Sequence, residues 1–160
     1  MTHTFSSPIG IVCLTEEDGA ITRIELTDVV GAASAPTPLM HEAELQIMTY
    51  LEGKRRLLDF PIRMVGTPFQ QRVWRALQQI PYGTTCPYCA IAAEIGNPRA
   101  SRAVGMACNK NPLLLIVPCH RVIGANGKLT GFAYGMNAKQ WLLELERMLC
   151  LHPQPLQVKL

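Results

Sequence analysis

The segment Pro118-Cys119-His120-Arg121 places a thiol, an imidazole and a guanidinium at consecutive positions. A cysteine is a nucleophile only as the thiolate, and an ordinary thiol needs a neighbouring base or positive charge to react at neutral pH. His120 and Arg121 could supply these if their side chains faced Cys119. Adjacent residues of a strand point to opposite faces, however, so proximity in sequence does not establish contact. On this pattern alone, Cys119 is either a reactive nucleophile or a buried structural cysteine.

A second cysteine pattern, Cys86-Pro87-Tyr88-Cys89, is typical of the redox site of glutaredoxins, and Val117-Pro118 would match their downstream proline. Such a site needs a buried strand directly before the first cysteine, within a βαβ unit. The preceding residues, Ile80 to Thr85, predict a turn instead. Thiol–disulfide exchange is therefore disfavoured, and we interpret the two thiols as incidental.

The chain has 160 residues, with six cysteines and four histidines. A disulfide framework would require an exported chain too small to build its own core, whereas 48% of these residues are apolar and the first residues lack a signal-peptide pattern. The longest run of bulky aliphatic residues, Leu113–Val117, is far shorter than the ~20 residues of a membrane span. The cysteine and histidine spacing does not match a closed zinc site. We expect a soluble intracellular protein with free thiols and no metal or cofactor.

The net charge of +3 conceals an uneven distribution. Residues 1–66 hold five basic and nine acidic side chains, whereas residues 67–160 hold ten basic and only three acidic ones. The second part is therefore a candidate for binding a polyanion such as nucleic acid. Basic stretches are also common on ordinary solvated surfaces, so charge alone supports this interpretation weakly.

The elements that must position the reactive residues divide at Gly66-Thr67-Pro68. Before this boundary we expect two strands, over Phe5–Leu14 and Ile21–Leu26, joined by an acidic turn that ends at a glycine. An amphipathic helix is expected over Leu39–Leu51, followed by a returning strand over Leu57–Val65 that a proline interrupts.

After the boundary the pattern becomes mainly helical. Thr67 is a candidate N-cap with proline at the first helical position, and two short helices are expected over Tyr88–Ile95 and Arg99–Cys108. These two form either a helix-turn-helix or an ordinary helical hairpin. A buried strand is expected over Leu113–Val117 and a last helix over Asn137–Leu149. The fold class is therefore α+β, with a small N-terminal antiparallel sheet-and-helix domain and a mainly helical C-terminal domain.

About half of the chain, residues 66–146, resembles the O6-alkylguanine-DNA alkyltransferases. The matching motifs occur in the family's order and spacing: Gly66-Thr67-Pro68-Phe69-Gln70, Val73-Trp74, Ile80-Pro81-Tyr82-Gly83, Tyr88, Gly96-Asn97-Pro98, Arg102-Ala103-Val104-Gly105, Asn111-Pro112, Pro118 to Gly124, Gly131-Phe132 and Lys139 to Leu143. The resemblance implies a ribonuclease-H-like domain over residues 1–65 and a winged-helix-like DNA-binding and alkyl-acceptor domain over residues 66–160.

The resemblance also implies a reaction. The protein would flip an alkylated guanine, and also O4-alkylthymine, out of duplex DNA and take its alkyl group irreversibly onto Cys119. His120 would draw the thiol proton through a water, Glu146 would orient the imidazole, and Asn111 would hold the neighbouring backbone. Tyr88 would donate to the leaving guanine and crowd the adjacent phosphate.

The same resemblance assigns a surface for DNA and a pocket for the base. Arg102 would fill the gap left in the base stack, from a helix that lies in the minor groove. The other implied DNA-binding residues are Asn97, Ala100, Ser101 and Gly105. The implied pocket residues besides Tyr88 are Val122, Phe132, Ala133, Tyr134 and Lys139. The family implies a monomer that acts on double-stranded DNA, without a membrane, in the cytoplasm of a bacterium or archaeon or with access to the nucleus of a eukaryote.

Two positions depart from the family's pattern. Tyr134 puts an aromatic ring where some members have glycine, and Pro87 stands where a polar residue often precedes the tyrosine. We expect Tyr134 to narrow the alkyl pocket. A different class, a DNA-binding module that recognises lesions without chemistry, would lack the acceptor cysteine. Since Cys119 is present, a protein that accepts the alkyl group is favoured over a module that only recognises lesions.

Overall fold

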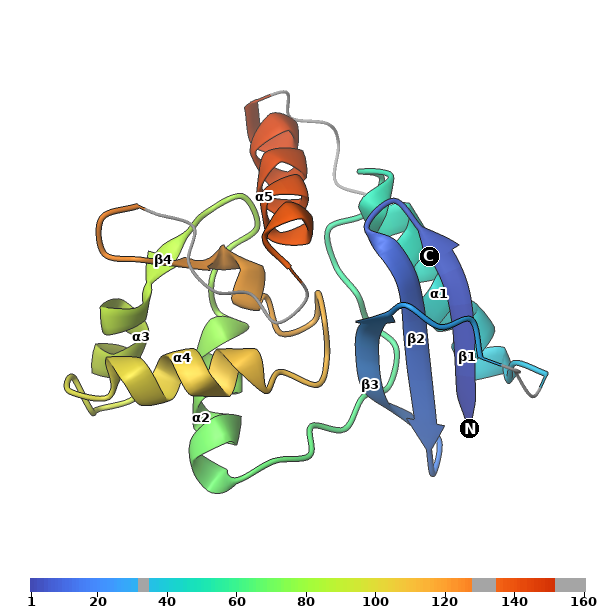
Figure 1. Cartoon of the computed structure of the whole chain (residues 1–160), viewed down its shortest axis with the longest axis horizontal. Helices are drawn as coiled ribbons and strands as arrows, with labels where there is room; N and C mark the ends of the chain where they lie inside the picture. Colours follow the sequence, from blue (N-terminus) through green and yellow to red (C-terminus); the bar gives the residue numbers. More distant parts are fainter. Residues whose placement is uncertain (32–34, 128–134, 152–160) are drawn as a thin grey trace.

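An antiparallel sheet forms the N-terminal part of the computed structural model, which describes residues 1–31, 35–127 and 135–151. Its strands are β1 (Thr2–Ser7), β2 (Gly10–Glu17) and β3 (Ala20–Thr27), in the order β1-β2-β3. Helix α1 (Pro38–Leu51) lies behind this sheet in Figure 1. The expected helix and the expected turn between β2 and β3 are confirmed.

The expected first strand over Phe5–Leu14 is wrong, because this segment contains a turn between two strands. Ser7 pairs with Gly10, and Phe5 pairs with Val12 across the ladder. Gly10 has a φ of 127°, in the region that favours glycine, and this lets the chain reverse immediately after Pro8-Ile9. Apolar content alone does not reveal such a tight reversal.

No strand forms over residues 57–65, where one was expected. Pro61 has no N–H to contribute to a ladder, and its carbonyl instead accepts a bond of 2.9 Å from the backbone of Ile21. Arg63 returns one bond of 3.0 Å to the Ile21 carbonyl, so Ile62 forms only an isolated bridge with β3.

Three helices form the second part: α2 (Pro68–Leu77), α3 (Tyr88–Glu94) and α4 (Ser101–Asn109). The start of α2 has the expected N-cap, since Thr67 and Gln70 form a reciprocal capping box. The Trp74 indole N–H donates a bond of 2.9 Å to the Ala107 carbonyl, which fixes α2 against α4. The expected pair of short helices is confirmed, and Figure 1 shows the three helices on the side of the molecule away from the sheet.

The expected strand over Leu113–Val117 is also wrong. These residues form turns, and Leu115 has a φ of 74°, which no regular strand tolerates. Only Leu113 forms a bridge, to Ile24 of β3. A short 3-10 helix, η1 (Cys119–Arg121), follows, and β5 (Val122–Ile123) then pairs in parallel with β4 (Cys86–Pro87).

Helix α5 (Met136–Leu151) closes the structure and extends the expected last helix slightly at both ends. It packs on η1. One cluster of buried apolar side chains runs through both parts of the chain and includes Leu14, Ile47, Trp74, Leu113 and Leu142. The architecture is α+β, with the three-stranded sheet and its helix followed by a helical region, as the sequence predicts.

Candidate functional site

Cys119 begins η1 and is almost completely buried, with 3% of its surface exposed. The side-chain amide of Asn111 donates to its sulfur across 3.1 Å. Burial raises the pKa of Cys119 to about 11, although the hydrogen bond from Asn111 and the charge of Lys139 act in the opposite direction. At neutral pH the resting group is therefore a thiol, and it needs a base to become a nucleophile.

His120 is fully buried next to this thiol in sequence. Its Nε2 lies 2.6 Å from Oε2 of Glu146, and its Nδ1 has no hydrogen-bond partner within the described part of the chain. Burial lowers the pKa of His120 below its ordinary value, against the raising effect of Glu146. A neutral imidazole facing a carboxylate must carry its proton on Nε2, which leaves Nδ1 as a free proton acceptor.

Glu146 is the centre of a buried polar network. Burial alone would raise the pKa of this carboxyl, but the hydrogen bonds and charges of His120 and Arg121 outweigh it and bring the pKa to about 2. Arg121 binds both carboxylate oxygens, at 2.8 Å from Nε and 3.1 Å from a terminal nitrogen. The backbone N–H of Gly83 donates to Oε1 at 3.2 Å, and the hydroxyl of Tyr50 donates to Oε2 at 2.6 Å. Glu146 is thus a fixed carboxylate.

The sequence suggests Arg121 only as a positive charge beside Cys119, whereas its guanidinium binds Glu146, and it suggests no role for Tyr50. Arg121 stands directly after the reactive pair, but a sequence does not show that its guanidinium turns toward α5 rather than toward the thiol. Tyr50 lies on the buried face of α1 among apolar side chains and looks like an ordinary core aromatic. One available signal is that a buried tyrosine hydroxyl must find a polar partner.

Lys139 of α5 is fully buried and donates from Nζ to the carbonyl of Val122 across 2.6 Å. Burial lowers its pKa, against the raising effects of Cys119 and Cys108. This bond ties α5 to the strand that follows the reactive helix. Three other residues expected to line the base pocket, Phe132, Ala133 and Tyr134, lie outside the described residues.

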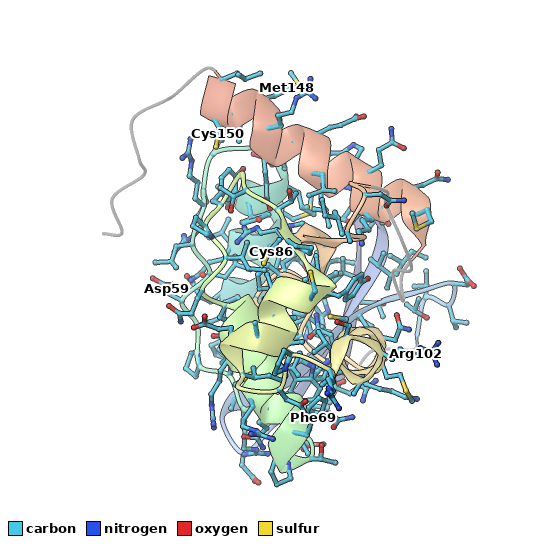
Figure 2. The ribbon with its side chains drawn as sticks, turned by 90° about the vertical axis from the view of Figure 1, so that its left-hand side faces the viewer. Asp59, Phe69, Cys86, Arg102, Met148 and Cys150 are labelled. Carbon is cyan, nitrogen blue, oxygen red and sulfur yellow. The ribbon has the colours of Figure 1, made fainter. Side chains whose placement is uncertain are left out.

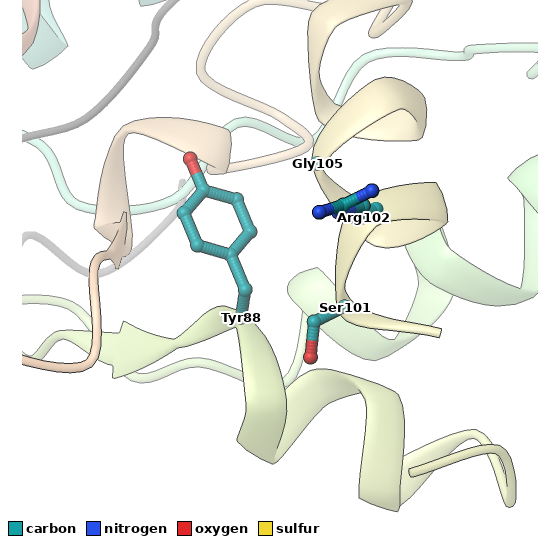
Figure 3. Close-up of a pocket in the computed structure, with 4 residues that line it drawn as sticks. All are labelled: Tyr88, Ser101, Arg102 and Gly105. Atoms are coloured by element: carbon teal, nitrogen blue, oxygen red, sulfur yellow. The ribbon is translucent and has the colours of Figure 1, made fainter. Parts of the chain in front are cut away.

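A shallow pocket of about 300 Å³ lies between α3 and α4. Its lining comprises Tyr88, Ser101, Arg102 and Gly105, all four of them expected DNA-binding residues. Figure 3 shows the Tyr88 ring rising from the start of α3 beside the part of α4 that carries the other three. A Cβ atom at Gly105 would lie 3.8 Å from the Tyr88 ring, which is ordinary van der Waals contact, so ring and helix lie close together and an alanine would also fit.

The remaining expected DNA-binding residues lie nearby. Asn97 is exposed in the connection between α3 and α4, and Ala100 is the half-buried N-cap residue of α4. Arg102 projects from α4 at the surface, well separated from Cys86 and Cys150 in Figure 2. An exposed cation that lies beside a pocket, on a helix of small residues, is suited to contact with nucleic acid.

Cys86 and Cys89 do not form the redox arrangement that their spacing would allow. All six cysteines are free. The strand at this site, β4, begins at Cys86 itself and contains only Pro87 besides. Burial first, and then the nearby Cys89 and Glu94, raise the pKa of Cys86, whereas a redox nucleophile requires a lowered one.

The described part of the chain contains no cluster of three or more side chains able to hold a metal ion. Among the same residues, no helix is long and apolar enough to cross a membrane.

The family model and the relatives that this chain matches all carry the names of DNA methyltransferases. Residues 68–148 match the family model described as "6-O-methylguanine DNA methyltransferase, DNA binding domain". The methylated-DNA–protein-cysteine methyltransferase of Methanosarcina acetivorans is 45% identical over 148 residues, which cover 89% of this chain and 95% of the relative. The constitutive enzyme of the same name from Bacillus subtilis is 42% identical, covering 91% and 94%.

Among solved structures, this chain is similar to the Mycobacterium tuberculosis protein OGT crystallised in complex with DNA. The two superpose with a TM-score of 0.84 at 44% identity, over 92% of each chain. The fold is thus that of DNA methyltransferases of this class. The chain belongs to the methylated-DNA–protein-cysteine methyltransferase family.

Proposed function

We propose that this protein repairs DNA by transferring the methyl group of O6-methylguanine to Cys119, which remains methylated. Membership of the family supports the reaction. The single structural observation that carries the choice of residues is the buried arrangement in which Asn111 contacts the thiol and Glu146 fixes the adjacent imidazole.

The proposed reaction begins with a thiol and a neutral imidazole. Nδ1 of His120 takes the Cys119 proton through a bridging water, and Glu146 stabilises the imidazolium that results. The sulfur attacks the methyl carbon, so an S–C bond forms as the C–O6 bond breaks. The departing guanine takes up a proton from Tyr88. The Tyr88 phenolate then regains a proton through water from the His120 imidazolium, so the proton released by the thiol ends on the guanine. No residue of the site could hydrolyse a thioether, so each molecule reacts once.

The raised pKa of Cys119 limits the reaction of the resting protein with electrophiles other than its substrate. A resting thiolate would react with many electrophiles in the cell, whereas a buried thiol does not. The nucleophile is then generated only when a substrate closes the site and the base acts in concert with attack. This suits a protein that is consumed by each reaction.

The DNA partner is proposed to be a duplex that carries the lesion. Because the methyl group lies inside the helix, the nucleotide must rotate out before it can reach a buried sulfur. Arg102 is proposed to occupy the vacated stack and Tyr88 to crowd the adjacent phosphate. The positions of Asn97, Ala100, Ser101 and Gly105 around α4 support a minor-groove contact of this helix.

We extend the proposal to the substrate range, the pocket, the domains, the oligomeric state and the location. The base pocket takes O4-alkylthymine as well as O6-alkylguanine, and it is completed by Val122 and Lys139 with Phe132, Ala133 and Tyr134. Residues 1–65 form a ribonuclease-H-like domain, and residues 66–160 carry DNA binding and alkyl acceptance. The protein acts as a monomer. In a bacterium or archaeon it acts in the cytoplasm, where the DNA lies.

Incubation with a duplex containing one O6-methylguanine tests the proposal. We expect intact-mass measurement to show one added methyl group per protein, and peptide mapping to place it on Cys119. Cys119→Ser should bind the duplex but take up no methyl group. Repeated turnover, or a methyl group on Cys86, would contradict the proposal. Tight binding of the lesion by wild-type protein without transfer would indicate a recognition module instead.

A further inference from the structure

Tyr50 reaches the reactive site from the N-terminal part of the chain. Its hydroxyl donates to Oε2 of Glu146 across 2.6 Å, and the same oxygen lies 2.6 Å from Nε2 of His120. Tyr50 is in α1, outside residues 68–148 that match the DNA-binding domain model. A residue of the sheet-and-helix part thus shares one carboxylate oxygen with the proposed base.

Within residues 1–31, 35–127 and 135–151, several charged and titratable groups surround this oxygen. Arg121 binds both oxygens of Glu146 and also contacts the Tyr50 hydroxyl at 3.2 Å. The Tyr82 ring packs edge-on against Tyr50, with centroids 5.9 Å apart. Lys139 also acts on His120, while Arg56 and Cys150 act on the neighbouring Tyr82.

We propose that Tyr50 is a positioning residue for methyl transfer: its hydroxyl holds Oε2 of Glu146 in place and limits how strongly this oxygen binds the His120 imidazole. The inference rests on the proposed function and adds a role for the N-terminal part of the chain.

The physical basis is competition for the lone pairs of one oxygen. Oε2 accepts from Tyr50, His120 and Arg121, so each donor shares the negative charge with the other two. Removing the Tyr50 donor leaves more charge for the imidazole, and the imidazolium form becomes more stable. The pKa of His120 then rises from its lowered value, and less of the base is neutral at a given acidic pH. Glu146 also becomes freer to rotate.

The chain provides a matched control. Tyr82 has a buried hydroxyl for which the described residues offer no hydrogen-bond partner, and its ring packs directly against Tyr50. Tyr50→Phe and Tyr82→Phe therefore each delete one buried hydroxyl from the same aromatic pair. Only the first deletion removes a hydrogen bond to Glu146.

The experiment measures the single-turnover rate of methyl transfer for wild type and both variants, from about pH 5 to about pH 9. For Tyr50→Phe we expect the acidic limb to move upward by about half a pH unit, which makes the reaction roughly threefold slower at pH values well below the His120 pKa and lets it converge with wild type at alkaline pH. Tyr82→Phe should retain the wild-type profile. A Tyr50→Phe profile that overlies wild type, or a loss that is equal at every pH, would overturn the proposal.

A second measurement does not depend on activity. NMR titration of protein with isotope-labelled histidine reports the His120 pKa directly, with the signal assigned by its absence in His120→Gln. We expect a higher His120 pKa in Tyr50→Phe than in wild type or Tyr82→Phe, and an unchanged value would overturn the proposal. If wild type itself takes up no methyl group, the proposed function fails, whereas active wild type with unshifted variants refutes only the role of Tyr50.

Discussion

The side-chain amide of Asn111 joins the reactive sulfur to the backbone that precedes it. Nδ2 lies 3.1 Å from Sγ of Cys119 and 2.8 Å from the carbonyl of Val117, while Oδ1 accepts from the N–H of Leu113 at 2.9 Å. The amide therefore bonds both ends of the turn that contains Leu115, whose φ of 74° is unfavourable for a branched side chain. One buried residue holds the strained turn and orients the thiol.

We expect Asn111→Ala to destabilise the protein and to slow repair. Two buried backbone groups would lose their partner, which costs about 2–4 kcal/mol in unfolding free energy. The thiolate would also lose a donor, so the pKa of Cys119 would rise further. Denaturant unfolding and single-turnover rates measure the two effects. Asn109→Ala, at an exposed position on α4, is the control and should change neither quantity appreciably.

Glu146→Gln is expected to lower stability in a pH-dependent manner. The pKa of Glu146 is about 2 in the folded protein, below its ordinary value of 4.5. Its ionised form therefore contributes stability that is present above about pH 4.5 and is lost as the pH falls toward 2. The variant should be about 3 kcal/mol less stable at neutral pH, because Arg121 is left buried without its charge partner.

Urea unfolding of wild type and variant across this pH range measures the difference, which should shrink as the pH falls below about 4.5. Glu144→Gln changes an exposed carboxyl on the same helix and should have little effect at any pH. A stability difference for Glu146→Gln that stayed constant down to acidic pH would contradict the ionic origin assigned to it.

The sequence predicted the elements whose boundaries are marked by local chemistry. Thr67-Pro68 marks the start of α2 because capping and proline geometry act within one helical turn. The errors fall where tertiary contacts override local pattern. Leu113–Val117 is apolar like a strand, but Asn111 and the edge of β3 hold it as a turn.

The candidate site likewise contains residues that a local motif identifies and residues that only the tertiary fold brings to them. Cys119 and His120 stand next to each other in sequence, and the family motif identifies both. The resemblance also identifies Glu146 of α5 as the partner of His120, but it does not identify the further donor to Glu146, which comes from α1. The Tyr50–Glu146 contact joins residues 96 positions apart, and a single sequence contains no local pattern that would predict it.

Replacement of both Cys86 and Cys89 by serine is expected to leave methyl transfer intact. Burial raises the pKa of Cys86, so this thiol is a poor redox nucleophile, and serine preserves its size. Single-turnover rates on a methylated duplex measure the effect, with Cys119→Ser as the inactive reference. A double variant without transfer activity, together with wild-type reduction of a glutathione mixed disulfide, would instead support the glutaredoxin hypothesis.

Arg102→Ala is expected to slow repair of duplex DNA much more than reaction with a free base. Arg102 is exposed beside the pocket formed with Tyr88, where its long side chain can enter a base stack. Only the duplex substrate must be unstacked, at a cost of a few kcal/mol, so we expect a loss of roughly ten- to hundredfold with paired O6-methylguanine. The reaction with free O6-methylguanine base should stay near the wild-type rate.

Arg99→Ala is the matched control, because it removes the same charge from an exposed position just before α4. If Arg102 acts mainly as a wedge, Arg99→Ala should weaken DNA binding in a salt-dependent way, and its transfer rate at saturating duplex should remain close to that of wild type. Arg102→Ala should instead lower the rate even when the duplex is saturating. Equal losses for Arg102→Ala on duplex and free base would show that the residue does not act through unstacking.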